Sequence, residues 1–256
     1  MEKTSYAAGT PCWVDIGTAD VDAARAFYSA VFGWDIPPGD EEFGGYTMAS
    51  LGGKLICGFG PQQNPGPPYW TTYVAVADVA DAAAKVTAAG GQVLAPPMEV
   101  ATAGQMAVFM DTQGAAFAVW QAGEHIGSQL VNEPGALCWN ELNARDTDQA
   151  LAFYPQVFGW VPRTSTDGPF PYTEWQLDGE SIAAMMPMAP QVPAEVPSFW
   201  MTYFAVADTD ATLAKITELG GAVMMPPMDI PVGRFAVVAD PAGAAFAVIA
   251  LSGEGM

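Results

Sequence analysis

An α+β fold made of two tandem modules is predicted by two features of this 256-residue sequence. The first is an internal repeat: Cys12–Ile16 and a helical segment that ends at Gly33 return as Cys138–Leu142 and a segment that ends at Gly159. The second is that short β-rich runs alternate with amphipathic helical runs inside each copy. A repeat of about half the chain favours two modules over one large domain.

The elements of the first module follow in the order strand, helix, two strands and a loop, then strand, helix and three strands. After the opening strand and helix, the pattern predicts strands at 44–51 and 54–59, a loop at 61–68, a strand at 69–78, a helix at 79–89, a strand at 92–95, a loop at 96–98, and strands at 105–110 and 115–120. The second module repeats this order. A polar stretch between the copies predicts modules at 1–122 and 136–256 with a linker at 123–135.

The charge of the chain argues against two classes of partner. The sequence contains 28 acidic and 8 basic residues, a formal net charge of −20, and such a surface repels nucleic acid and anionic lipid head groups. The start of the chain does not resemble a secretory signal, and no stretch approaches ~20 uninterrupted apolar residues. We therefore expect a cytoplasmic protein, monomeric or homodimeric, without nucleic-acid or membrane partners.

Several motifs resemble one known family. Pro11–Asp15, Trp139–Leu142, the linker motif His125–Glu133 and the turn Asp240–Gly243 are similar to motifs of the vicinal oxygen chelate superfamily of glyoxalases, bleomycin-resistance proteins and extradiol dioxygenases. The chain looks most like the two-module glyoxalase-like group common in actinobacteria. The likeness spans nearly the whole chain, and it implies that each module pairs two βαβββ units into a mixed sheet that curls into a cup-like half-barrel.

The resemblance also implies where a metal ion would bind, and the residues at those places do not suit one. Metal-using members draw ligands from three strands, and the corresponding positions here are Trp13, Thr71 and Ala118 in the first module and Trp139, Met201 and Ala247 in the second. Divalent ions need imidazole or carboxylate ligands, which indole, thioether and methyl groups do not replace. The one histidine, His125, falls in the linker, so we expect no metal and no other cofactor.

Alternation along the strands predicts the contents of each cup. If Trp13 points inward, so does Asp15, while Val14 and Ile16 face the covering helices. The same argument places Trp139 and Glu141 in the second cup. The other residues expected to contact a ligand are Thr71, Tyr73, Trp120, Met201, Tyr203, Tyr46, Tyr172 and Glu174. Large rings, flexible methionines and one acid per cup suit a bulky aromatic ligand, although aromatic side chains on strands also serve simply as core.

Three functions remain open from the sequence. The first is a metal-free protein that binds a bulky aromatic or polycyclic small molecule, in natural-product binding, resistance or biosynthesis. The second is a metal-independent lyase, isomerase or cyclase in which Asp15 or Glu141 acts as general acid or base, because an apolar cup raises the pKa of a carboxyl group. The third is a divalent-metal enzyme of the same superfamily with non-standard ligands. His125 is expected to join the modules, and Arg234 to form a surface ion pair.

Overall fold

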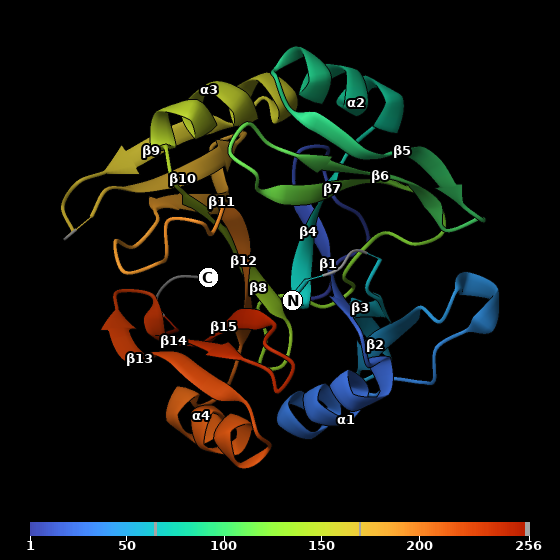
Figure 1. Ribbon diagram of the computed structural model, residues 1–256, viewed down its shortest axis with the longest axis vertical. Coiled ribbons are helices and arrows are strands. Elements are labelled where there is room, and N and C mark those ends of the chain that lie inside the picture. The colour runs from blue at the N-terminus through green and yellow to red at the C-terminus, as the bar shows by residue number, and fades with distance from the viewer. Residues whose placement is uncertain (64–65, 169, 254–256) are drawn as a thin grey trace.

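Two mixed β-sheets stand back to back at the centre of the molecule, with two helices at each end of the pair (Figure 1). The computed structural model describes residues 1–63, 66–168 and 170–253. The predicted α+β fold of two modules is confirmed. None of the helices in these described residues is long and apolar enough to cross a bilayer.

The first sheet has the strand order β2-β3-β1-β4-β7-β6-β5. The elements of this half of the chain are β1 (Pro11–Thr18), α1 (Val21–Phe32), the 3-10 helix η1 (Glu41–Phe43), β2 (Thr47–Leu51), β3 (Lys54–Pro61), β4 (Tyr69–Ala75), α2 (Val79–Ala88), β5 (Gln92–Val100), β6 (Gly104–Met110) and β7 (Ala116–Ala122). Strands β1 and β4 pair antiparallel at the middle of the sheet, whereas β1 with β3 and β4 with β7 are parallel.

The second sheet repeats this order and adds one strand, giving β13-β14-β15-β12-β8-β11-β10-β9. Its elements are β8 (Leu137–Ala144), α3 (Thr147–Phe158), β9 (Val161–Ser165), β10 (Tyr172–Leu177), β11 (Glu180–Pro187), β12 (Phe199–Ala205), α4 (Thr209–Glu218), β13 (Ala222–Ile230), β14 (Gly233–Ala239) and β15 (Ala245–Leu251). All strands of the first sheet thus come before the predicted linker, and all strands of the second come after it. The exact module boundaries stay a prediction.

The repeated helices begin and end as the sequence predicts. Asp20 caps α1 by accepting a hydrogen bond from the Ala23 amide at 2.9 Å, and Asp146 does the same for α3. Gly33 and Gly159 end the two helices with φ values of 75° and 72°, a left-handed conformation that glycine adopts without strain. The two copies of the repeat therefore share the same helix start and stop signals.

The two largest core clusters lie between the modules. Val14 and Ile16 of the first sheet share a buried cluster with Phe204 and Phe246 of the second. Helices α1 and α4 close this cluster at one end of the molecule, and α2 and α3 close a similar one at the other end (Figure 1). Because the helix-covered faces pack against the other module, the opposite faces of the two sheets point away from each other.

Two loop predictions were wrong. The Pro-Pro segments at 96–97 and 226–227 lie inside β5 and β13. Both strands are sheet edges, where a proline without an N–H costs no ladder hydrogen bond, and their pairing shifts register across Ala95/Met98 and Met225/Met228. Strand β9 was not predicted at all, because all five of its residues are exposed and show no alternation.

Candidate functional site

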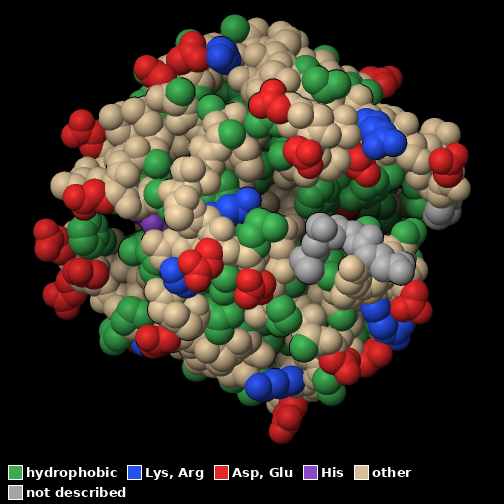
Figure 2. All heavy atoms as spheres, turned by 180° about the vertical axis from the view of Figure 1, so that it is seen from behind, with side chains coloured by type: hydrophobic (Ala, Val, Ile, Leu, Met, Phe, Trp, Pro, Cys, Tyr) green, Lys and Arg blue, Asp and Glu red, His purple; other side chains and the backbone are tan. Residues whose placement is uncertain are grey.

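Most of the predicted ligand-contacting residues gather on the outward faces of the two sheets. On the first sheet, which we call the first cup, the main-chain register aligns Trp13 with Tyr73 and Tyr73 with Ala118. These residues form one buried cluster with Trp120. The second cup is the corresponding face of the second sheet, where Met201, Tyr203, Ala247 and Ile249 cluster with Trp139 and Phe235. Figure 2 shows a hollow with apolar side chains on the side where this second sheet lies.

A carboxyl group bonded to tyrosine hydroxyls lies on the first cup's floor. Asp15 Oδ2 accepts hydrogen bonds from the Tyr73 hydroxyl at 2.6 Å and the Tyr46 hydroxyl at 3.4 Å. The Tyr46 oxygen in turn accepts a bond from Trp13 Nε1 at 3.1 Å. Burial raises the pKa of Asp15 to about 6, although the bonds from Tyr73, Thr71 and Tyr46 oppose this rise. The group can thus hold or release a proton near neutral pH.

The second cup repeats this arrangement with a longer acid. Tyr203 donates to Glu141 Oε1 at 3.0 Å, and Trp139 Nε1 donates to the Tyr172 hydroxyl at 3.2 Å. Burial raises the pKa of Glu141, opposed by hydrogen bonds from Tyr203 and Tyr172. The two acids differ in access: Glu141 is only 5% exposed, whereas Asp15 is partly exposed within its cup.

Glu174 lies apart from this cluster. Its strand β10 and the Glu141 strand β8 are both neighbours of β11, and both residues lie opposite Ala184 of β11. Its carboxylate, however, accepts a bond from Ser181 Oγ at 2.7 Å and lies 4.0 Å from the Arg163 guanidinium. The structure therefore holds Glu174 in polar contacts near the sheet edge.

Glycine at position 58 makes room for the first cup's tyrosine. A Cβ built on Gly58 would lie 1.8 Å from the Tyr46 hydroxyl, and the position is opposite Asp15 in the sheet. In the second sheet Ala184 stands opposite Glu141. The close packing of Tyr46 on strand β3 at Gly58 is thus a property of the first cup.

Replacing Gly58 by alanine is expected to turn Tyr46 away from Asp15 and Trp13. Losing these hydrogen bonds should lower the free energy of unfolding by about 1–2 kcal/mol and raise the pKa of Asp15, because the bond from Tyr46 lowers it. Urea denaturation and a carboxyl NMR titration measure the two effects. Gly17→Ala on the same sheet is the control, since its Cβ would meet nothing closer than 3.7 Å; equal behaviour of the two variants would contradict this account.

Two family models match this chain. Residues 13–120 match the model described as a glyoxalase-like domain, and residues 136–248 match the Glyoxalase/Bleomycin resistance protein/Dioxygenase superfamily. The chain belongs to this superfamily. The resemblance predicted from the motifs is thereby confirmed.

Relatives along the whole length support the assignment. "Putative glyoxylase CFP32" of Mycobacterium tuberculosis is 43% identical, and the match covers 97% of this chain and 97% of that protein. "Anthracycline biosynthesis protein DnrV" of Streptomyces peucetius is 37% identical, with 97% and 95% covered.

Solved structures with low sequence identity share the fold. An Mn(II)-bound glyoxalase from Novosphingobium aromaticivorans is 18% identical, with a TM-score of 0.67 and coverage of 95% of this chain and 82% of that one. A 2,2',3-trihydroxybiphenyl 1,2-dioxygenase from Sphingomonas wittichii is 14% identical, with a TM-score of 0.67 and coverage of 97% and 93%. At such identities the likeness concerns the fold alone.

The metal that some members of the superfamily use does not fit the residues of this member. Trp13 and Ala118 lie in the first cup's buried cluster and Met201 and Ala247 in the second's, at positions where the resemblance implies ligands. Among the described residues, no group of three or more histidine, cysteine, aspartate or glutamate side chains could hold an ion. The second cup offers one carboxyl group with tyrosine hydroxyls, and the first offers the same with a single imidazole, that of His125, beside Trp13. Either set is poor for a divalent transition metal.

His125 belongs to the first cup, which sequence reasoning missed. Its ring centroid lies 4.5 Å from that of Trp13 at an interplanar angle of 85°, and 5.4 Å from that of Trp120. Burial lowers the pKa of His125 to about 4, so the imidazole is neutral at pH 7. No local pattern marks this residue, because the linker folds back over the cup only in three dimensions.

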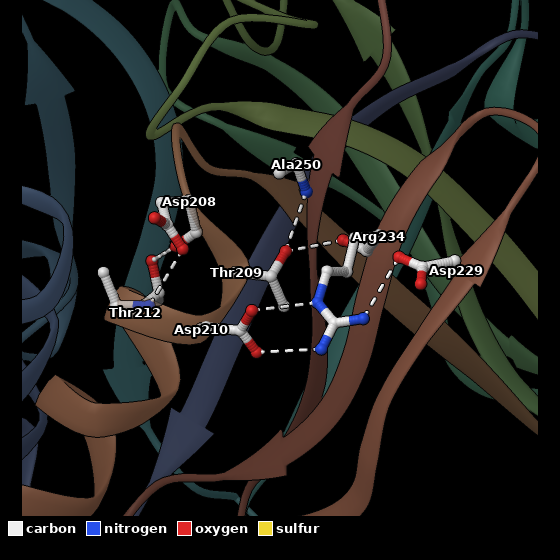
Figure 3. A network of polar contacts seen from close by, with 8 residues as sticks. Asp208, Thr209, Asp210, Thr212, Asp229, Arg234 and Ala250 are labelled. Atoms are coloured by element: carbon white, nitrogen blue, oxygen red, sulfur yellow. Dashed lines mark hydrogen bonds and ion pairs between the residues drawn. The ribbon is translucent and has the colours of Figure 1, made fainter.

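Arg234 forms the predicted surface ion pairs of the second module (Figure 3). Its guanidinium contacts both carboxylate oxygens of Asp210 at 3.0 and 3.1 Å and one of Asp229 at 3.1 Å. The arginine thus joins the start of α4 to β14 and β13. With two carboxylates on it, Arg234 is poorly suited to hold a ligand anion.

The raised pKa of Asp15 predicts how stability depends on pH. In the unfolded chain this group ionises near pH 4, but in the folded protein only near pH 6. The contribution of Asp15 to the free energy of unfolding is therefore complete below about pH 4 and is lost as the pH rises through about 6. The loss is at most about 3 kcal/mol. The variant Asp15→Asn should lack this loss. Urea unfolding of the unaltered protein and of Asp15→Asn, each at pH 4 and pH 7.5, measures this loss. If the two free energies of unfolding differed by the same amount at both pH values, the prediction would be contradicted.

Proposed function

We propose that this protein binds a bulky aromatic or polycyclic small molecule in its first cup. The observation that carries the proposal is the carboxyl group of Asp15, a partly exposed residue bonded to Tyr73 and Tyr46, on a floor of aromatic side chains. Trp13 and Trp120 supply the apolar, aromatic part of this floor, although they are only 4% and 6% exposed. Ala118 of the same cluster has a small side chain, which fills less of the cup than a ring would.

The polar cluster gives the ligand a defined orientation. With a pKa of about 6, Asp15 can donate a hydrogen bond to a ligand oxygen when protonated and accept one when ionised. Small-molecule sites typically combine an apolar lining with a few convergent polar groups of this kind. An oxygen substituent on the aromatic ligand is the matching chemical feature.

The relatives support this ligand class. The name of the Streptomyces peucetius relative refers to anthracyclines, which are polycyclic aromatic compounds. The proposed role is accordingly in the binding, resistance or biosynthesis of an aromatic natural product. We further propose that binding needs no resident metal, because Trp13, Thr71 and Ala118 occupy the positions where the superfamily implies ligands.

Calorimetric titration with a panel of polycyclic aromatic compounds tests the proposal. We expect micromolar dissociation constants for some compounds, unchanged after treatment of the protein with a chelator. Flat traces for all compounds at micromolar protein would overturn the proposed function. Affinity that disappears with the chelator and returns with one divalent metal would overturn the metal-free part of it.

A second candidate is a metal-independent lyase, isomerase or cyclase. The short 2.6 Å bond between Tyr73 and Asp15 and the raised pKa of this acid favour it, because a general base or acid works best with a pKa near the operating pH. In that case Asp15→Asn should abolish turnover of a bound compound while its binding persists. Equal turnover by Asp15→Asn and by the unaltered protein would exclude this mechanism.

A further inference from the structure

Residues 123–128 form a strap across one end of the first cup. At its start, the Gly123 amide donates to the Ala103 carbonyl at 2.8 Å and the Glu124 amide to the Thr102 carbonyl at 3.0 Å. At its other end, the Ser128 amide donates to the Cys12 carbonyl at 2.7 Å. The strap therefore runs from the turn between β5 and β6 to the first strand, passing over the side chains of the cup.

The second anchor of the strap requires a glycine. Gly127 has a φ of 104°, and a Cβ at this position would lie 2.4 Å from the Cys12 carbonyl oxygen. Beside it, Ser128 Oγ donates to the Ile56 carbonyl at 2.8 Å, and the Tyr6 hydroxyl donates to the Ser128 carbonyl at 2.6 Å. These contacts hold the strap in one place, so its side chains have defined positions.

The strap places the His125 ring against two tryptophans of the cup. The ring meets Trp13 edge to face, and the His125 carbonyl accepts a bond from Trp120 Nε1 at 2.7 Å. The ring nitrogen Nδ1 is buried, and within the described part of the chain it has no hydrogen-bond partner. Such a group costs about 1–3 kcal/mol unless something pairs with it, so each case calls for an explanation.

The second cup lacks this feature. The sequence contains a single histidine. Cys12 and Trp13 are 0% and 4% exposed, whereas their counterparts Cys138 and Trp139 are partly exposed. The polar ring nitrogen of His125 thus distinguishes the first cup from the second.

We propose that His125 is a specificity-determining residue of the first cup, whose Nδ1 forms a hydrogen bond with a hydroxyl group on the aromatic ligand. This inference rests on the proposed function and narrows its ligand class to hydroxylated polycyclic aromatic compounds. A hydroxyl can donate to Nδ1 or accept from it, so it pairs with either tautomer of a neutral imidazole. A ligand with only C–H groups at this place leaves Nδ1 unpaired, as it is without ligand, so it gains no hydrogen bond here and binds more weakly than a hydroxylated compound.

Two probes and two variants test this inference. The probes are 2,6-dihydroxyanthraquinone and unsubstituted anthraquinone, titrated at pH 7 by calorimetry. His125→Phe keeps the ring against Trp13 but removes the nitrogen, and His125→Asn keeps a polar atom near the place of Nδ1. We expect His125→Phe to bind the dihydroxy probe about tenfold more weakly and anthraquinone unchanged, with His125→Asn recovering part of the loss.

Because His125 is the only histidine in the sequence, its imidazole nitrogen signals can be assigned without mutation. We expect the dihydroxy probe, and not anthraquinone, to shift the Nδ1 resonance of the unaltered protein. An equal response to both probes, or no response to either bound probe, would overturn the inference while leaving the proposed function intact. If the unaltered protein bound neither probe nor any other polycyclic compound, the proposed function would fail and the inference with it.

Discussion

Replacing Asp111 by alanine is expected to lower the free energy of unfolding by about 3 kcal/mol, the largest effect on stability that we predict for a substitution. Asp111 is 3% exposed, and its carboxylate accepts bonds from the Gln113 amide at 2.8 Å, the Ala115 amide at 2.9 Å and the Tyr154 hydroxyl at 2.9 Å. The alanine variant leaves these three donors without their acceptor. Tyr154 comes from the other module, so both the turn and the contact between modules weaken.

Thermal unfolding measures this effect, and roughly 2–4 °C per kcal/mol is typical for a chain of this size. We therefore expect a melting temperature lower by about 6–12 °C. Tyr154→Phe removes one hydroxyl and should cost less than Asp111→Ala. The control is Asp81→Ala, whose exposed carboxylate pairs with Lys85 on α2 and should cost under about 0.5 kcal/mol. Melting of Asp111→Ala within 2 °C of the unaltered protein would show that the turn does not hold the modules together.

Replacing Trp13 by alanine is expected to weaken binding of a polycyclic aromatic probe about 100-fold. The indole packs in the first cup's aromatic cluster, donates to the Tyr46 hydroxyl and supports the His125 ring. Truncation of a central aromatic residue in a binding site commonly costs about 2–4 kcal/mol, and each 1.4 kcal/mol is tenfold in affinity. Calorimetry with 2,6-dihydroxyanthraquinone gives both the affinity and the number of sites.

Trp139→Ala is the matched control, because Trp139 holds the same place in the second cup and donates to Tyr172. It should change the affinity of the first cup by less than about threefold, since the side chains of the two cups lie in separate clusters. The reverse outcome, a large loss with Trp139→Ala and none with Trp13→Ala, would move the binding site to the second cup. Circular dichroism and melting curves of both variants separate lost binding from lost folding.

The prediction from sequence was best where the signal is local. The alternation of Trp13 and Asp15 with Val14 and Ile16 follows from the two-residue period of a strand, and the structure places these pairs on opposite faces. The prediction from sequence was least successful at the edges of the sheets. Whether prolines end a strand depends on which neighbours the strand has, and β5 and β13 are edges only because of the assembled sheet order.

The sequence by itself determined the duplicated α+β scaffold, the helix caps and the sets of side chains that share one face of each strand, because these depend on residues a few positions apart. Only the tertiary structure decided which side chains meet. Tyr46 reaches Asp15 across 31 positions, Tyr28 donates to Asp240 across 212, and His125 returns from the linker to Trp13. Such contacts depend on how the sheets curl and on how two modules pack, and no short pattern in the chain encodes either.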